Sequence, residues 1–245
     1  MPRRRGPGLL VAAGAAAILL GAAAVGVLAW SSGLPRSAEQ RIRDALLSSL
    51  DGAGSLEVRL ETRPGYRVLA GQIDHLEISG TALRAGELVA DRFSLVGDAL
   101  QLDMGKLAGG GGLSVSRARR LDMEMVVSEE SVNRYLQATY ELARLLHVQL
   151  LPQGPRLLMD AQLQDQAVRI SLDSKLQVEP GNVVAVVPDR LAIEREGAQA
   201  LALSLAGADS PLRIEIGQLP VPVAIDRVTV GEGELHLFAS YRPPS

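Results

Sequence analysis

The sequence predicts an α+β protein: an N-terminal transmembrane helix followed by a body of mostly antiparallel strands. Two observations predict this class. Residues 8–30 form an uncharged, apolar run, and most of the chain beyond residue 55 alternates apolar with polar side chains, at the period of two that is typical of half-buried strands. Only two stretches of the body show the 3.6-residue period of an amphipathic helix.

The N-terminal segment predicts both an anchor and a location. Residues 1–5 form a basic tail with three consecutive arginines, Arg3 to Arg5. At about 1.5 Å per residue, the run 8–30 is long enough to cross a hydrocarbon layer of roughly 30 Å. The positive-inside rule then places the N-terminus in the cytoplasm and the body outside it, in a single-pass protein of the cell membrane. A signal peptide cleaved after Ala29 is the alternative, and it also exports the body.

A short connector, residues 31–36, joins this run to a domain at residues 37–245. Six residues reach at most about 20 Å, so an anchored body would stay close to the membrane. A first helix is expected from Ser37 to the stop at Asp51-Gly52. Its apolar face would carry Ile42, Ala45, Leu46 and Leu50.

Strands are expected over most of the remaining chain. Leu56, Val58 and Leu60 alternate with charged residues, which indicates the first strand. A second helix is expected from Ser128 to about His147, with Glu129 and Glu130 in its first turn, where the helix dipole favours acids. The other expected strands are the segments around Val68 and Ile73–Ile78, then Leu83–Ala90, Arg92–Val96, Ala99–Met104, Leu113–Arg117, Leu121–Val127, Leu157–Leu163, Val168–Val178, Val183–Val187, Leu191–Ile193, Leu201–Leu205, Leu212–Ile216, Val223–Val230 and Leu235–Ala239.

The body therefore consists, twice over, of one helix followed by a meander of strands. Strands with one apolar face must cover that face. With only two helices available, the sheet must fold over on itself or curl around the helices. The strand pattern leaves both a sandwich and a curled sheet open.

Composition excludes several kinds of function. The chain has no cysteine, which rules out disulfides and thiolate metal sites. A net charge of -3 with scattered basic residues does not indicate nucleic-acid binding. His75, His147 and His236 lack neighbours at metal-ligand spacing, and no nucleophile or phosphate-binding motif occurs. We therefore expect no cofactor, no metal site and no enzymatic activity.

Arginines provide candidate contacts to lipid headgroups. Arg117, Arg119 and Arg120 cluster beside a glycine-rich loop, and Arg63 and Arg67 flank a turn. Guanidinium groups bind phosphate oxygens well, often in a bidentate manner. The alternative interpretation of these residues is a solvated, charged surface.

Three stretches carry recognisable family motifs. Leu69–Asp74, with a Leu-x-Gly-x-Ile-Asp pattern, resembles a strand turn; Val127–Leu136 resembles a helix start; and Leu219–Val230 resembles a proline-bearing penultimate strand. In this order and spacing, the motifs make the chain from about Arg41 onward similar to the LmeA-like phospholipid-binding family. They are structural motifs and contain no catalytic residues.

The resemblance implies both a fold and a partner. It implies a strongly curved, mostly antiparallel sheet that wraps around two amphipathic helices and leaves an apolar cleft for membrane phospholipids. It also implies a role in envelope lipid or glycolipid homeostasis. The residues that we expect to line this cleft are Leu56, Val58, Leu60, Ile73, Leu76, Ile78, Met123, Met125, Val132, Leu136, Leu142 and Leu146.

A second class of function stays open at this stage. The body could be a non-catalytic structural or interaction domain of the envelope, with a fully packed sheet and a partner-binding surface. The sequence does not specify the lipid, the direction of any transfer or the oligomeric state.

Overall fold

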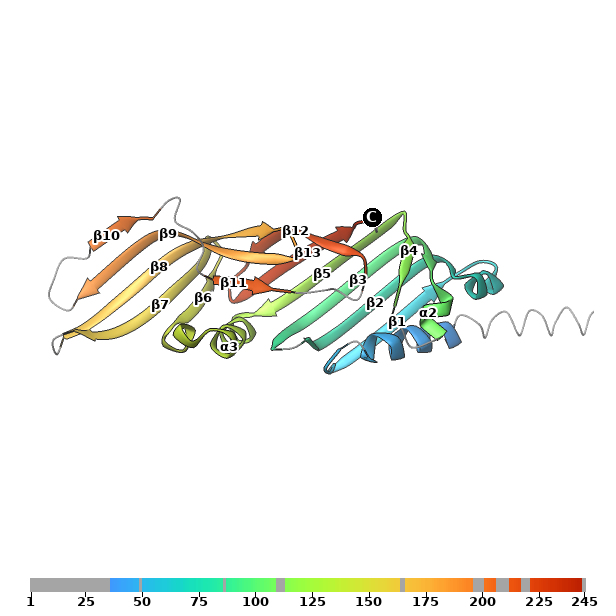
Figure 1. The fold of residues 1–245 in the computed structure, drawn as a ribbon, viewed down its shortest axis with the longest axis horizontal. Helices are drawn as coiled ribbons and strands as arrows, with labels where there is room; N and C mark the ends of the chain where they lie inside the picture. The colour runs from blue at the N-terminus through green and yellow to red at the C-terminus, as the bar shows by residue number, and fades with distance from the viewer. Residues whose placement is uncertain are drawn as a thin grey trace, which may run out of the picture.

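The computed structural model describes residues 36–48, 50–85, 87–108, 113–163, 166–195, 201–205, 212–216 and 221–243. These residues form an elongated body of two antiparallel sheets, arranged along the long axis, with a few helices (Figure 1). The predicted tail at 1–5, the anchor at 8–30 and nearly all of the connector lie outside the described residues. Within the described residues, no helix has the length and apolar character needed to span a membrane.

Sheet A is formed by the first half of the body and by the last hairpin. Its strand order is β1-β2-β3-β5-β13-β12, and the short β4 pairs with β3. All the pairings are antiparallel. The strands are β1 (Ser55–Glu61), β2 (Gln72–Ala85), β3 (Leu88–Leu102), β4 (Val115–Arg117), β5 (Arg120–Ser128), β12 (Val223–Val230) and β13 (Glu234–Tyr241).

Sheet B is built from the segment between β5 and β12. Its order is β10-β9-β8-β7-β6, and β11 pairs with β9. The strands are β6 (His147–Leu151), β7 (Gly154–Leu163), β8 (Gln166–Glu179), β9 (Val183–Arg195), β10 (Leu201–Ser204) and β11 (Leu212–Glu215). The strands thus form two sheets where one continuous curved sheet was expected, because the chain leaves sheet A after β5 and returns to it only with β12 and β13.

The two sheets share one core. A single cluster of buried hydrophobic side chains extends from β1 through sheet A to β9 and β11 of sheet B. At the junction, β12 contacts β8, and the backbone N–H of Ile225 donates to Oδ1 of Asn182 (3.0 Å). The hydrophobic core therefore couples the two sheets into one body.

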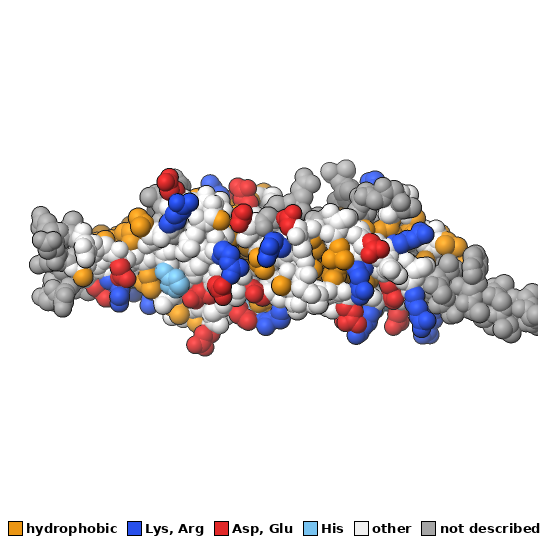
Figure 2. Space-filling view, turned by 90° about the horizontal axis from the view of Figure 1, so that it is seen from below, with side chains coloured by type: hydrophobic (Ala, Val, Ile, Leu, Met, Phe, Trp, Pro, Cys, Tyr) orange, Lys and Arg blue, Asp and Glu red, His pale blue; other side chains and the backbone are white. Residues whose placement is uncertain are grey.

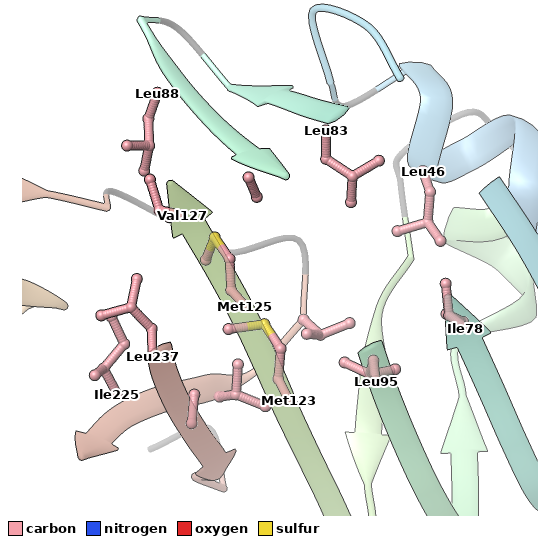
Figure 3. Close-up of a cluster of buried hydrophobic side chains, with 14 of the residues drawn as sticks. Leu46, Ile78, Leu83, Leu88, Leu95, Met123, Met125, Val127, Ile225 and Leu237 are labelled. Carbon is pink, nitrogen blue, oxygen red and sulfur yellow. The ribbon is translucent and has the colours of Figure 1, made fainter. Parts of the chain in front are cut away.

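The first expected helix is confirmed and spans residues 36–48 in the described part of the chain. Ser37 lies inside this helix. Ala38, Ile42, Ala45 and Leu46 are buried and pack on sheet A; Figure 3 shows Leu46 directed toward Ile78 and Leu83. The other helical elements are η1 (Gly65–Ala70), α2 (Met104–Ala108), α3 (Glu129–Thr139) and η2 (Glu141–Leu145).

The second expected helix is shorter than its apolar stripe indicated. α3 ends at Thr139, a 3-10 turn follows, and His147 already begins β6. The expectation of a helix to His147 was wrong, because the chain from His147 onward pairs with β7. This pairing buries Val148 and Leu150 as strand residues of β6.

Several expected strand boundaries were also wrong, and Val68 lies in η1, not in a strand. The stretch Leu83–Ala90 contains the turn between β2 and β3, and the separate strands expected on either side of Gly97 are one strand, β3. Gly97 does not break β3, because it stays paired with Leu76 of β2 and Leu121 of β5. The position lacks space for a larger residue: a Cβ there would lie 2.9 Å from Cδ1 of Leu121. Similarly, Pro188 does not end β9 but pairs with Ser174 where the β8–β9 register shifts, a position that tolerates proline.

Candidate functional site

One face of sheet B is apolar across all of its main strands. The register aligns Val148, Leu157, Leu172, Leu191 and Leu203 in one row from β6 to β10. A second row aligns Met159, Ile170, Ile193 and Leu201. Neighbouring side chains in such rows are in contact, so the rows form a continuous hydrocarbon surface.

The opposite face of the same strands is polar. Arg156 forms an ion pair with Asp173 (2.6 Å), and Arg169 forms one with Asp160 (2.9 Å). The strict period of two thus separates a charged, solvated face from an apolar one.

The apolar face is only partly covered. Beside α3 and η2 it forms an open groove of about 430 Å³, which we call the sheet B groove. Its floor consists of Leu157, Met159, Ile170, Leu172 and Leu191, and its walls consist of Tyr140, Glu141, Leu146 and Leu212. Leu157 on the floor and Leu212 in the wall are buried, whereas the other four floor residues are half-buried. The groove thus offers solvent-accessible hydrocarbon on sheet B.

Hydrogen bonds hold the walls in place. The Tyr140 hydroxyl donates to the carbonyl of Arg213 in β11 (2.8 Å), and the Tyr135 hydroxyl accepts from the N–H of Glu215 (3.2 Å). Both tyrosines therefore tie the C-terminal half of α3 to β11. These two bonds position the groove walls.

The start of α3 is fixed to β6 in the same way. Asn133 is buried; its Nδ2 donates to the carbonyl of Val148 (2.8 Å) and its Oδ1 accepts from the N–H of the same residue (2.8 Å). A Glu129 carboxylate oxygen accepts from the N–H of Leu150 (2.8 Å). These contacts explain why the helix-start motif Val127–Leu136 contains Glu129 and Asn133.

The groove is continuous with the core. A second apolar space lies between α3 and sheet B and has a volume of only about 10 Å³. Leu157 and Leu212 line both this space and the groove. Val132 and Leu136 of α3 line it. The apolar surface therefore runs from open groove to closed core without a polar break.

The chemistry of the groove is that of a hydrocarbon-binding site. Among its lining residues, only Tyr140 and the exposed Glu141 carry polar side chains. No arrangement of His, Asp or Glu able to hold a metal ion occurs among the described residues. A groove with this lining can hold an apolar chain, and its volume lies within the usual range for ligand pockets.

The predicted lining residues fall into three places. Leu146 lines the groove, and Val132 and Leu136 line the adjoining closed space. The side chain of Leu142 lies outside those that the structure describes. Leu56 is half-buried and lines a separate open pocket of about 460 Å³ on sheet A, whose lining is more polar than that of the groove. The remaining predicted residues, which are Val58, Leu60, Ile73, Leu76, Ile78, Met123 and Met125, are buried in the core of sheet A.

Figure 3 shows how this second group lies. Leu46 of the first helix lies near Ile78, whereas Met123 and Met125 lie farther along the sheet, toward Leu237 and Ile225. Met123 is 2% exposed and Met125 6% exposed, so the core already covers these side chains. The open groove with an almost entirely apolar lining lies instead on β7, β8 and β9.

Residues of the groove floor were predicted only as strand residues. Leu157, Ile170, Leu172 and Leu191 belong to alternating segments like those of sheet A. Alternation identifies the apolar face of a strand, but it does not show whether that face is covered. The sequence held one signal for an open face: it predicts only two helices, and these are too few to cover both sheets.

The candidate headgroup arginines lie away from the groove. Arg117 is in β4, opposite Gln101 of β3, and Arg120 forms an ion pair with Asp122 in β5. Arg119 lies between them and is exposed. All three belong to sheet A, so they do not form a headgroup site at the mouth of the sheet B groove.

The histidines take part in polar pairs on sheet A and near α3. His75 Nδ1 lies 2.8 Å from Asp98 Oδ1, and this hydrogen bond holds the pKa of Asp98 below its ordinary value. His236 lies near Glu124 and Glu234 (3.3 and 3.5 Å).

On the face seen in Figure 2, acidic and basic side chains are interleaved along the body and leave no large area of one sign.

Comparison with known proteins identifies the family. A search of curated proteins and a search of solved structures returned no match. The model of the LmeA-like phospholipid-binding family matches residues 30–240, which is most of the chain. The matched region includes β1 to β12, β13 except its last residue, the groove, and α3 with its Glu129 and Asn133 contacts. The chain is therefore a member of the LmeA-like phospholipid-binding family.

Proposed function

We propose that this protein is a membrane-anchored, extracytoplasmic phospholipid-binding protein that holds an acyl chain in the sheet B groove. The single observation that carries the proposal is the open apolar groove beside α3, in a chain whose family binds phospholipids. Residues 8–30 would anchor the protein, and the body would act in envelope lipid homeostasis without covalent chemistry.

The energetics favour an acyl chain as the occupant. Each CH₂ group removed from water contributes about 0.8 kcal/mol, so a groove that covers several of them needs few polar contacts. Met159 on the floor has an unbranched, adaptable side chain that suits chains of variable shape. The two apolar rows continue past the groove to β10, where Leu201 and Leu203 are 55% and 46% exposed and are not among the residues that line the groove.

The groove walls indicate where the headgroup would lie. The described residues that line the groove include no lysine or arginine, and Glu141 is exposed at its edge. A phosphate group would not be attracted to this carboxylate. The headgroup would therefore remain in solvent, and the protein would recognise the chain more than the headgroup.

Native mass spectrometry of the full chain, released from detergent, tests lipid binding. Leu172→Gln places an amide in the centre of the groove floor, whereas Ser171→Gln places the same amide on the polar face of the same strand. We expect phospholipid adducts on the wild type and on Ser171→Gln, and adducts reduced several-fold on Leu172→Gln. Equal adduct levels on the two variants would contradict a site in the groove.

A further inference from the structure

A short turn at one end of sheet A displays two large apolar side chains. Tyr66 and Leu69 of η1 are 60% and 55% exposed, whereas Val68 between them is 3% exposed. A 3-10 helix has three residues per turn, so residues i and i+3 lie on the same face. Tyr66 and Leu69 therefore project together, while Val68 secures the turn to the core.

The turn is held rigidly by the strands around it. Arg67 forms an ion pair with Asp74 (2.9 Å) and donates to the carbonyl of Arg63 (3.1 Å). The amide of Gln101 in β3 donates to the carbonyl of Ala70 (2.7 Å), and the N–H of Leu102 donates to the carbonyl of Gly71 (2.8 Å). A braced turn keeps its two apolar side chains directed outward and prevents them from folding back onto the protein.

This end of sheet A is also where the first helix begins. The N–H of Leu60, at the end of β1, donates to the carboxylate of Glu39 (2.9 Å), so the start of the first helix lies beside the strand that leads into η1. Figure 1 shows both at the same extremity of the long axis. The apolar run 8–30 is separated from this extremity by the six-residue connector.

Basic side chains surround the turn. Arg63 precedes η1, Lys106 is in α2 directly after β3, and Arg117 is paired opposite Gln101; all three are exposed. An aromatic and an aliphatic side chain flanked by Lys and Arg is the composition that sits at a membrane interface next to anionic headgroups.

We infer that Tyr66 and Leu69 dock this end of the body onto the bilayer that residues 8–30 enter. The inference rests on the anchoring part of the proposed function. It adds an orientation: the body stands on the η1 end of sheet A, and the sheet B groove lies in the half of the molecule away from the bilayer. The exposed Leu145 and Leu201, in that other half, would face water.

Single-cysteine labelling of the full chain tests this orientation. The natural chain has no cysteine, so a fluorophore sensitive to polarity can be attached at one position at a time: Tyr66→Cys, Leu69→Cys, Leu145→Cys or Leu201→Cys. The proteins are reconstituted in vesicles of phosphatidylcholine and phosphatidylglycerol that contain a lipid with a nitroxide near its headgroup. All four side chains are large, apolar and exposed, so the last two are matched controls.

We expect labels at 66 and 69 to emit at shorter wavelength and to be quenched several-fold more strongly than labels at 145 and 201. Equal quenching at all four positions, or stronger quenching at 145 and 201, overturns the orientation while leaving the anchor intact. A chain that fails to float with the vesicles overturns the anchor and the docking together. Normal anchoring with unquenched labels at 66 and 69 overturns the docking alone.

Discussion

A few buried polar side chains determine how α3 sits on sheet B. Asn133 satisfies both backbone groups of Val148, and Glu129 satisfies the N–H of Leu150. β6 is an edge strand of sheet B, and these two residues, together with the N–H of Gly233, which donates to the carbonyl of Leu150 (2.9 Å), take the place of a neighbouring strand. The positions Glu129 and Asn133 are thus structural, and they indirectly place the groove wall that follows at Tyr140 and Glu141.

Replacing Asn133 with Ala should destabilise the protein strongly. The substitution leaves the N–H and the carbonyl of Val148 buried without partners, at about 1–3 kcal/mol for each orphaned group. We expect the free energy of unfolding to fall by roughly 2–4 kcal/mol, measured by chemical denaturation. Arg134→Ala is the control: it removes an ion pair with Glu130, whose side chain is 82% exposed, and should cost less than about 0.5 kcal/mol. Similar losses for both variants would refute the role given to Asn133.

His75 and Asp98 form the residue pair with a defined pH response. The hydrogen bond from His75 lowers the pKa of folded Asp98, so the pair stabilises the fold above the ordinary carboxyl pKa. That stabilisation is lost as the pH falls through the lowered value. In His75→Val, we expect the pKa of Asp98 to rise, as measured by NMR titration of its carboxyl carbon. An unchanged titration curve would show that His75 is not the cause.

At the scale of elements, η1 and β3 depend on one glycine. Gly71 ends η1 with φ 75°, in the left-handed region, and a Cβ at this position would lie 2.2 Å from the carbonyl oxygen of Leu102. Both the backbone conformation and the close approach therefore require glycine. This accounts for the glycine in the Leu-x-Gly-x-Ile-Asp motif.

Two glycine variants separate these two requirements. Gly181 also has positive φ (86°), but a Cβ there would contact nothing within 4 Å. We expect Gly181→Ala to cost about 1 kcal/mol and Gly71→Ala to cost about 3 kcal/mol or more, because only the latter adds a steric overlap. The comparison is made by thermal unfolding. Equal midpoints for the two variants would contradict the packing described around Gly71.

The groove as an element predicts weak headgroup selectivity. Its lining is hydrocarbon apart from Tyr140 and Glu141, so binding should follow the acyl chain. Phosphatidylcholine, phosphatidylethanolamine and phosphatidylglycerol with identical chains should compete within a few-fold of one another in a displacement assay. A preference of a hundredfold or more for one headgroup would require polar contacts that this groove does not provide.

Much of the strand content could be predicted from the sequence, because alternation is a local property. Leu157 and Leu172 were correctly placed in strands, as were Met123 and Met125. Which apolar face remains open is not a local property: Met125 is buried in the core of sheet A, whereas Leu172 is half-buried on the floor of the sheet B groove. The division into two sheets was likewise hidden, since it depends on the return of β12 and β13 to β5 after almost a hundred intervening residues.

At the scale of the whole molecule, the η1 end of sheet A and the sheet B groove lie far apart. Five strand spacings of about 4.8 Å place β12 roughly 24 Å from β1 in sheet A, and the groove strands of sheet B lie beyond β12. If the body stands on its η1 end, the groove cannot reach into the anchoring bilayer. The bound lipid would then be exchanged with a second membrane or with another protein.

The central claim is that β7, β8 and β9 hold a phospholipid acyl chain. Photo-crosslinking tests it most directly, with the full chain incubated in detergent with a phosphatidylcholine bearing a diazirine on its acyl chain, so that the groove can bind this lipid before both are reconstituted into vesicles. Peptide mapping by mass spectrometry should locate adducts in the groove strands, at residues such as Met159, Ile170 and Leu172, in addition to those expected in the anchor. Adducts restricted to the anchor, or found in the buried core of sheet A at Met123 and Met125, would contradict the claim.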